Sequence, residues 1–344
     1  MASVPDVPKK QKLIKGEPRM NHPFRTITSL CAAAILSLSG LTGCGAKSES
    51  KSTEIVTTVY AVYDMAKQLT AETETPVTVK LLLTPGGESH SYEPTPSDTA
   101  TVQRCALFAY IGGESEQWAD KLIESSRNGK QNLKLMDSVS LLTEETVEGM
   151  EEDEDDHDEA HDHDHDASKG IDEHIWTSPL NADAMLTALR DAVKLTLPDD
   201  SAKIDAAYAP LHEKYLALDS EAKDICDSAK NNTLIFADRF PFRYLTSAYG
   251  WKYYAAFSGC SSDTDASAAT LSFLISKVKE LDIKTVFYLE NSSKKISDAV
   301  CRATGAEACE IQSGNNVSAE DFKAGKHYQD IMAENLAAIR KALN

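Results

Sequence analysis

The stretch SAKIDAAYAPLHEKYLALDSEAKDICDSA, residues 201–229, decides the expected fold. Its apolar side chains recur every three or four residues, at Ile204, Tyr208, Leu211, Tyr215, Leu218, Ala222 and Ile225. This is the period of an amphipathic helix. An unbroken helix of this length would reach about 40 Å, long enough to act as a stiff connection between two lobes. Pro210 leaves a second arrangement open, in which it kinks the helix or separates two ordinary surface helices.

Strand and helix patterns alternate on both sides of this stretch. Before it, strands are expected at 54–60, 76–83, 107–111 and 132–136, with helices at 61–70, 99–104, 118–126 and 182–195. After it, strands are expected at 233–237, 252–257, 284–289 and 307–311, with helices at 242–249, 267–281, 292–304 and 321–343. The alternation predicts an α/β fold with two lobes, each a mostly parallel sheet flanked by helices, joined by the long connecting helix.

The domain boundaries follow from these patterns. We expect an N-terminal α/β lobe at 54–198, the connecting helix at 199–230 and a C-terminal α/β lobe at 231–344. The roughly 300 residues that follow the expected signal peptide are too many for one modest core, which also favours two lobes.

A short apolar segment precedes the first lobe. Residues 27–43, ITSLCAAAILSLSGLTG, follow several basic side chains and are too short to span a membrane comfortably, so residues 1–43 predict a signal peptide, with Met20 as an alternative start. The segment ends in LTGC, which resembles the bacterial lipobox. Cys44 is therefore the expected lipidation site and residues 44–53 a tether, although an ordinary cleaved signal with an incidental cysteine is the alternative. We expect an extracytoplasmic protein held at the bacterial cell membrane by its lipid alone.

The charge is strongly acidic and unevenly placed. The formal net charge is −19, and many of the acidic side chains fall in a histidine-rich loop expected over 144–168. This charge argues against a nucleic-acid partner and favours cations. Residues 151–166, EEDEDDHDEAHDHDHD, have too little apolar surface to offset the entropy of ordering, so we expect a mobile loop.

Four histidines in this loop suggest metal capture, because imidazole and carboxylate groups suit zinc and its transition-metal neighbours. They are His157, His161, His163 and His165. A solvated acidic linker is the alternative interpretation.

Two isolated histidines stand outside that loop. His90 lies in PGGESHSYEPTPSD, residues 85–98, just after a predicted strand, and His174 lies in DEHIW, residues 172–176. Ligand sites in such sheets lie beyond the carboxyl ends of strands, especially where two lobes face each other. Two imidazoles from separate loops, with a carboxylate, could form a metal cage. Asp172 and Glu173 are candidates to orient the His174 ring.

Four motifs carry a resemblance to a known family. PGGESHSYEPTPSD, IGGESEQW, IDEHIWTSP and the histidine-rich loop are similar to those of the metal-binding receptors of ABC importers, the zinc and manganese cluster, and the similarity covers nearly all of residues 53–344. It implies one ion held between two lobes and delivered to a membrane permease. His90 and His174 match two histidine ligands of the family, and the loop favours Zn2+, with Mn2+ as the alternative ion. We expect a monomer and no enzymatic activity.

The C-terminal lobe departs from the family pattern. Many zinc-binding members have a histidine in a His-x-Ala-Phe-x-Tyr segment, and Arg239, which cannot bind a cation, stands at that position here. Asp238 and Glu290, both near predicted strand ends, are the candidate metal ligands of this lobe. Their oxygens would give a mixed site that discriminates less between zinc and manganese. Alternatively, Asp238 pairs with Arg239 or Arg243 and holds no metal.

Other functions and pairings stay open from the sequence. A zinc hydrolase would need a general base such as Glu88 or Glu116, but the chain has no HExxH motif. A metal-buffering or adhesive surface lipoprotein without coupling to import is a further alternative. One disulfide among Cys260, Cys301 and Cys309 would suit an oxidising compartment, and the sequence does not assign it.

Overall fold

The computed structural model describes residues 52–87, 89–125, 131–151, 170–261 and 265–344. The expected signal peptide, the lipidation site Cys44 and the four loop histidines His157, His161, His163 and His165 lie outside the described residues. Among the helices of the described ranges, none combines the length and the apolar character that crossing a bilayer requires.

The first sheet is parallel throughout, with strand order β2-β1-β3-β4. Its strands are β1 (Thr53–Thr57), β2 (Val77–Leu81), β3 (Leu107–Tyr110) and β4 (Gln131–Lys134), and its helices are α1 (Tyr60–Leu69), α2 (Pro96–Arg104), α3 (Gln117–Ser125) and α4 (Pro179–Thr196). These elements are called the N-terminal lobe below. Helix α2 begins earlier than predicted because Thr95 and Asp98 form a capping box and Pro96 occupies the first turn.

The second sheet is also parallel, with strand order β6-β5-β7-β8. Its strands are β5 (Thr233–Arg239), β6 (Lys252–Phe257), β7 (Thr285–Leu289) and β8 (Glu307–Ile311), and its helices are α6 (Arg243–Tyr249), α7 (Ala268–Glu280), α8 (Lys295–Thr304), α9 (Ala319–Ala324) and α10 (Tyr328–Leu343). These elements are called the C-terminal lobe below.

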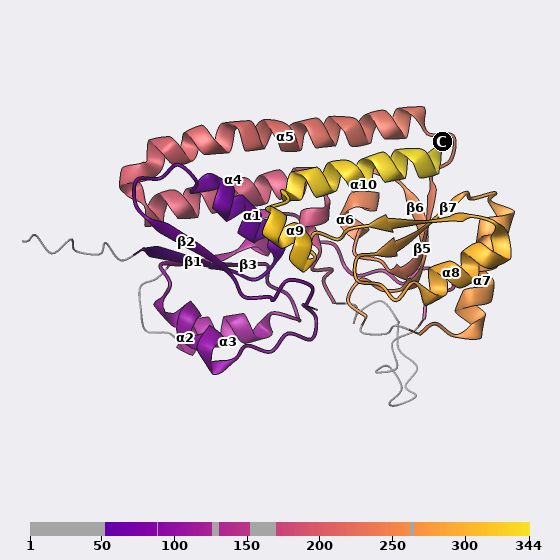
Figure 1. Ribbon diagram of the computed structural model, residues 1–344, viewed down its shortest axis with the longest axis horizontal. Helices are drawn as coiled ribbons and strands as arrows, with labels where there is room; N and C mark the ends of the chain where they lie inside the picture. Colours follow the sequence, from indigo (N-terminus) through magenta and orange to yellow (C-terminus); the bar gives the residue numbers. More distant parts are fainter. Residues whose placement is uncertain (1–51, 88, 126–130, 152–169, 262–264) are drawn as a thin grey trace, which may run out of the picture. The chain divides into compact units, whose positions relative to one another are not determined.

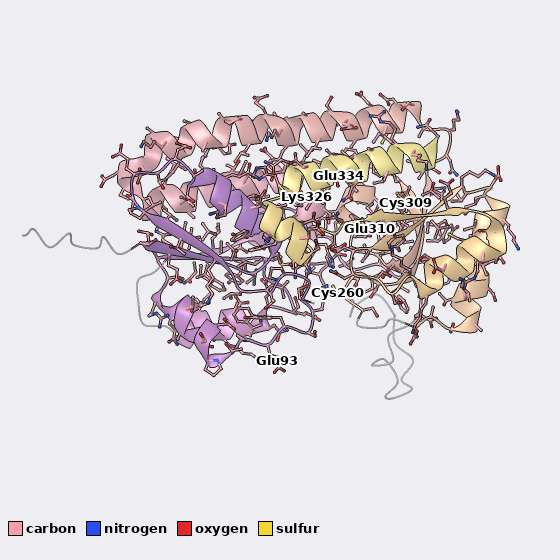
Figure 2. All side chains as sticks on the ribbon, viewed as in Figure 1. Glu93, Cys260, Cys309, Glu310, Lys326 and Glu334 are labelled. Carbon is pink, nitrogen blue, oxygen red and sulfur yellow. The ribbon has the colours of Figure 1, made fainter. Side chains whose placement is uncertain are left out.

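The last part of the chain forms two helices where one was expected. Gly325 ends α9 in a left-handed conformation (φ 68°), which a glycine adopts without steric cost. Lys326 Nζ then donates a hydrogen bond to Glu334 Oε2 at 2.7 Å and so links the turn to α10 (Figure 2). The sequence pattern missed this break because the apolar spacing continues on both sides of it.

Helix α5 (Ser201–Ser228) is a single helix of 28 residues that includes Pro210, so the alternative of two separate helices is wrong. It packs against α1 and α4 of the N-terminal lobe and against α6 and α10 of the C-terminal lobe (Figure 1). One apolar core continues through this contact, from Leu189 through Ile204 to Leu336. The two lobes therefore share a core along α5, and the expected long connection is observed.

Candidate metal centre

His90 lies in the loop between β2 and α2, beyond the carboxyl end of a parallel strand. The loop is fixed from the C-terminal lobe, because the Asn316 side-chain amide donates hydrogen bonds to the carbonyl oxygens of Thr84 and Gly87, both at 2.8 Å. Gly86 has a φ of 79° and donates its backbone N–H to Val317 O at 2.9 Å. A half-buried histidine is thereby placed where the two lobes meet.

His174 stands immediately before the short 3-10 helix Ile175–Thr177 that leads into α4, and its ring is almost fully buried. Asp172 Oδ1 accepts a hydrogen bond from the His174 backbone N–H at 2.9 Å and lies 3.2 Å from Nδ1. A hydrogen on Nδ1 would be donated to this carboxylate, which leaves Nε2 as the ring nitrogen for an ion. Burial alone would lower the pKa of His174, but the adjacent Asp172 carboxylate raises it above its ordinary value.

The second candidate for orienting His174 makes different contacts. Glu173 Oε1 accepts a hydrogen bond from the Ser115 backbone N–H at 2.7 Å, and Oε2 pairs with the Ser115 hydroxyl. Glu173 therefore ties the His174 segment to the loop after β3, while Asp172 is the residue that contacts the imidazole.

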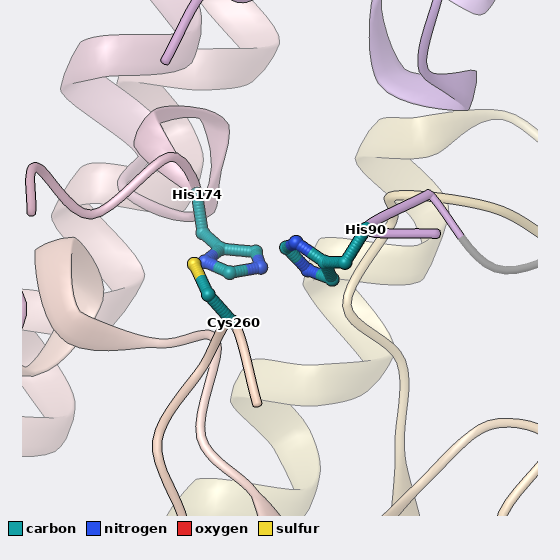
Figure 3. Close-up of side chains that lie close together, drawn as sticks. All are labelled: His90, His174 and Cys260. Carbon is teal, nitrogen blue, oxygen red and sulfur yellow. The ribbon is translucent and has the colours of Figure 1, made fainter. Parts of the chain in front are cut away.

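The rings of His90 and His174 lie side by side, with centroids 5.2 Å apart and planes inclined by 55°. Cys260, in the loop after β6, joins them, and one ligand atom from each of the three residues lies within 4.8 Å of the others (Figure 3). Two ligands of a tetrahedral zinc ion are roughly 3.5 Å apart, so modest side-chain movement would bring all three to one ion. That the two histidines bind an ion stays a prediction.

Sequence reasoning assigned no metal role to Cys260. It has no CxxC partner, and its companions in the cluster are distant along the chain. The usable signal was its position, because Cys260 follows β6 at the edge of the sheet where ligand sites form.

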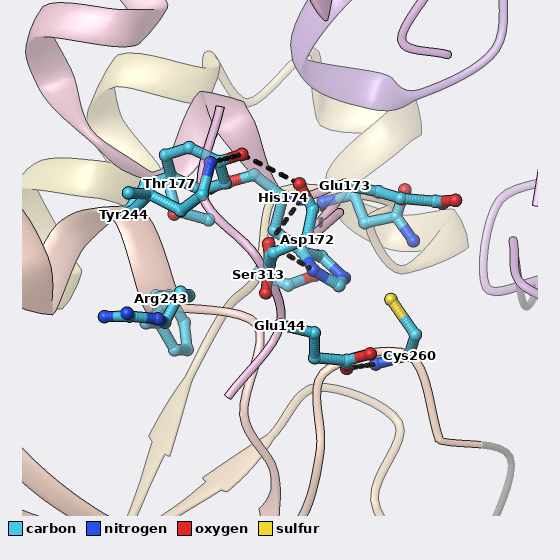
Figure 4. Close-up of polar contacts among 12 residues, drawn as sticks. Glu144, Asp172, Glu173, His174, Thr177, Arg243, Tyr244, Cys260 and Ser313 are labelled. Carbon is cyan, nitrogen blue, oxygen red and sulfur yellow. Dashed lines mark hydrogen bonds and ion pairs between the residues drawn. The ribbon is translucent and has the colours of Figure 1, made fainter. Parts of the chain in front are cut away.

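The segment around Cys260 is held close to His174. The Cys260 backbone N–H donates to Glu144 Oε1 at 3.1 Å (Figure 4). A Cβ atom added to Gly259 would lie 2.9 Å from Phe240 O and 3.1 Å from His174 Cε1, so only glycine fits here without displacement. Burial raises the pKa of the Cys260 thiol, and neighbouring carboxylates, Glu144 first, raise it further.

The disulfide that the sequence left open among three cysteines is not formed in this structure. Cys260, Cys301 and Cys309 are not joined to one another by a disulfide. The Cys260 thiol is therefore not committed to a covalent partner in this structure.

Asp238 and Glu290 lie in the C-terminal lobe near strand ends, but neither belongs to the group of described side chains that could share one ion with His90 and His174. Asp238 sits at an irregularity of β5, where its Oδ1 accepts the Arg239 backbone N–H at 2.9 Å and its Oδ2 the Leu289 backbone N–H at 3.2 Å. Its two oxygens thus bind backbone groups of β5 and β7.

Glu290 directly follows β7 and is held by one residue of the loop after β8. Its Oε2 accepts the Ser313 backbone N–H at 2.8 Å, and its Oε1 pairs with the Ser313 hydroxyl. Burial raises the pKa of Glu290 to about 7.

Two large cavities among the described residues border the three-residue cluster. One, of about 280 Å³, is lined by His90, His174, Arg239 and Glu290 among others. The other, of about 300 Å³, is lined by His90, Glu144, Glu173 and Cys260 among others. Glu290 therefore shares a cavity with both histidines although it is not clustered with them.

Comparison with known proteins relates the chain to a family. The family model described as ZnuA, zinc-uptake complex component A, periplasmic, matches residues 55–342. The zinc-binding lipoprotein AdcA of Streptococcus pneumoniae serotype 4 is 31% identical over 316 residues, which cover 92% of this chain and 60% of AdcA. The chain thus spans 60% of the length of that relative.

One further relative and one solved structure are covered over most of their length. The high-affinity zinc uptake system protein ZnuA of Bacillus subtilis is 29% identical over 298 residues, covering 87% of this chain and 90% of that protein. The crystal structure of the Zn(II)-bound ZnuA-like domain of Streptococcus pneumoniae AdcA superimposes with a TM-score of 0.69 at 27% identity, covering 85% of this chain and 99% of that chain.

Proposed function

We propose that this chain, which belongs to the family of periplasmic zinc-uptake components A (ZnuA), is an extracytoplasmic receptor that binds one zinc ion and delivers it to an ABC permease. One observation carries the proposal most directly. Two imidazole rings from loops far apart in the sequence lie side by side, at a centroid distance of 5.2 Å, where the two lobes meet. The names of the relatives, which refer to zinc binding and zinc uptake, support zinc as the ion.

His90 and His174 are the proposed histidine ligands. Glu290 is the better placed of the two oxygen candidates, because it lines the same cavity as both rings. Asp238 is the weaker candidate, since it lines a different cavity that neither histidine lines, and both of its oxygens accept backbone hydrogen bonds. The chemistry proposed for this site is binding and release of an ion, with no catalysed reaction.

The attachment and capture functions rest on the sequence and on the lipoprotein name of one relative. Cys44 would carry the lipid and residues 44–53 would form the tether of a monomeric receptor. The histidine-rich loop would raise the local zinc concentration beside the site, which is an effective-concentration role. The lobe boundaries at 198–199 and 230–231 remain part of the same proposal.

Release of the ion requires only a small movement in this proposal. The lobes are joined along α5 and also directly, because Trp176 Nε1 donates to Ser313 O at 2.8 Å and the Tyr328 hydroxyl donates to Trp176 O. A wide hinge opening would break this buried network. The permease would therefore release zinc by binding more tightly to a slightly displaced, low-affinity state of the receptor.

Zinc titration against a competing chelator tests the proposal. We expect one tight site in the full chain, loss of that site in His90→Ala and in His174→Ala, and its retention when residues 152–166 are deleted. His327→Ala is the matched control, because His327 pairs with Asp64 outside the cluster. A tight site that survives the loss of both His90 and His174 would contradict the assignment.

Coupling to import needs a separate measurement. In bacteria that lack their own zinc receptor, the wild-type chain should restore growth when zinc is scarce, and the His90→Ala and His174→Ala variants should not. A protein that binds one zinc ion tightly but never restores growth would be a buffering lipoprotein rather than an import receptor.

A further inference from the structure

Cys260 lies beside both histidines although the sequence pattern gave it no role in metal binding. We infer that the Cys260 sulfur is the third protein ligand of the zinc ion, supplied by the C-terminal lobe. The inference rests on the proposed function of the same site. It makes the site a two-histidine, one-cysteine centre, where the resemblance to the family had suggested a third histidine at the position now held by Arg239.

The geometry supports a shared ion. One ligand atom each from His90, His174 and Cys260 lies within 4.8 Å of the other two, and Figure 3 shows the thiol beside the His174 ring on the side of the cluster opposite the His90 backbone. The three residues come from the loop after β2, the segment before α4 and the loop after β6. Ligands from both lobes would then hold one ion, so zinc binding would tie the lobes together.

The local chain is adapted to this close approach. Gly259 lets the backbone pass His174 at a distance where a Cβ atom would come within 3.1 Å of the ring. The hydrogen bond from the Cys260 backbone to Glu144 fixes the same turn from the other side. Two independent observations therefore constrain the backbone from which the sulfur projects.

Cys260 also differs from the other thiols of the described chain. The others belong to or pack against apolar core clusters, namely Cys105, Cys226, Cys301 and Cys309. Cys260 belongs to none of the apolar clusters formed by the described residues and borders a polar cavity instead. Core packing thus accounts for the other four cysteines and leaves Cys260 without that explanation.

The chemistry predicts which ion the site prefers. Thiolate is a soft ligand that favours zinc, whereas manganese prefers carboxylate and water oxygens. Three protein ligands leave one position of a tetrahedral ion open. That position is available to water or to Glu290, which lines the cavity that both histidines share. A sulfur ligand would make the site more selective for zinc than the nitrogen and oxygen set that the sequence alone suggested.

X-ray absorption at the zinc edge tests the inference, with the full chain loaded with one equivalent of zinc. In the wild type we expect one sulfur at about 2.3 Å together with nitrogen or oxygen at about 2.0–2.1 Å. The sulfur shell should be absent from Cys260→Ser and kept in Cys309→Ser, a matched loss of a half-buried thiol away from the cluster.

Affinity gives a second readout. Loss of a residue that hydrogen-bonds to a metal ligand typically lowers metal affinity about 10–100-fold. Cys260→Ser removes a proposed direct ligand, so it should weaken zinc binding by more than about 100-fold. Manganese binding should change much less, so the preference for zinc over manganese should shrink. Cys309→Ser should leave both affinities unchanged.

The outcomes separate the inference from the function beneath it. A wild-type zinc spectrum with nitrogen and oxygen neighbours alone, together with a tight site that His90→Ala and His174→Ala abolish, would overturn the role of Cys260 and leave the receptor proposal standing. A wild-type chain that binds no zinc tightly would overturn both. Because the wild-type spectrum decides the first case, the test does not depend on how well Cys260→Ser folds.

Discussion

Replacing Asp172 with alanine should weaken zinc binding without removing any ligand. The Asp172 carboxylate is buried, accepts the His174 backbone N–H at 2.9 Å and lies 3.2 Å from the ring nitrogen Nδ1. It therefore fixes both the backbone and the ring of a proposed ligand. In Asp172→Ala the ring loses the partner that points Nε2 toward the ion.

The expected losses of zinc affinity and of stability in Asp172→Ala follow from these two contacts. Loss of a partner that orients a metal-binding histidine costs about 10–100-fold in affinity, which is about 1.4–2.7 kcal/mol. The zinc-free protein should also lose roughly 1–3 kcal/mol of stability, because a buried N–H group is left without an acceptor. Asp172→Asn keeps an acceptor oxygen but not the charge, so its zinc affinity should be intermediate.

Competition with a fluorescent chelator measures the affinity, and urea unfolding of the zinc-free protein measures the stability. Asp183→Ala is the matched control, because Asp183 pairs with His212 at 2.6 Å between α4 and α5, outside the metal cluster. This control should lower stability and leave zinc affinity unchanged. The reasoning would be refuted if Asp172→Ala bound zinc as tightly as the wild type, or if Asp183→Ala weakened binding equally.

Three further substitutions probe the surroundings of the site. Asn316→Ala removes the donor that holds two carbonyl groups of the His90 loop, so it should cost roughly 1–3 kcal/mol in urea unfolding and also weaken zinc binding; unchanged binding would show that the loop needs no such support. Gly259→Ala should push against the His174 ring and weaken zinc binding about tenfold or more, as measured by chelator competition, and wild-type affinity would count against the tight fit. Burial raises the pKa of Glu116 from 4.5 to about 7, so the folded protein holds this proton more tightly than the unfolded chain. The protonated Glu116 side chain therefore contributes its full share of the folding free energy below about pH 4.5. This contribution, on the order of 3 kcal/mol, is lost as the pH rises to about 7. Glu116→Gln cannot titrate, so its stability should not show this loss. Urea unfolding of the zinc-free proteins at both pH values checks this, and equal pH dependence in the two would contradict it.

The sequence predicts the fold well because its signals are local and repeated. The apolar period of residues 201–229 indicates one long helix, and the structure contains α5 with Pro210 inside it. The break at Gly325 was missed because a left-handed glycine interrupts a helix without changing the apolar spacing around it.

The site is predicted only in part, because its geometry depends on contacts between distant segments. The placement of His90 beyond a strand end, and the family resemblance that pairs it with His174, gave a reason to expect the two near each other, and their rings do lie side by side. Cys260 reaches the same place through the packing of β6 and the small size of Gly259, which no sequence spacing reveals. The backbone hydrogen bonds to the Asp238 carboxylate also cannot be predicted from the sequence, because they depend on how β5 and β7 are aligned.

Anomalous X-ray diffraction at the zinc edge, from crystals of the zinc-loaded chain, tests the central claim most directly. A single strong peak should lie between the His90 and His174 rings, about 2.0–2.1 Å from a nitrogen of each. A peak elsewhere in the molecule, with these two rings turned away from it, would contradict the account.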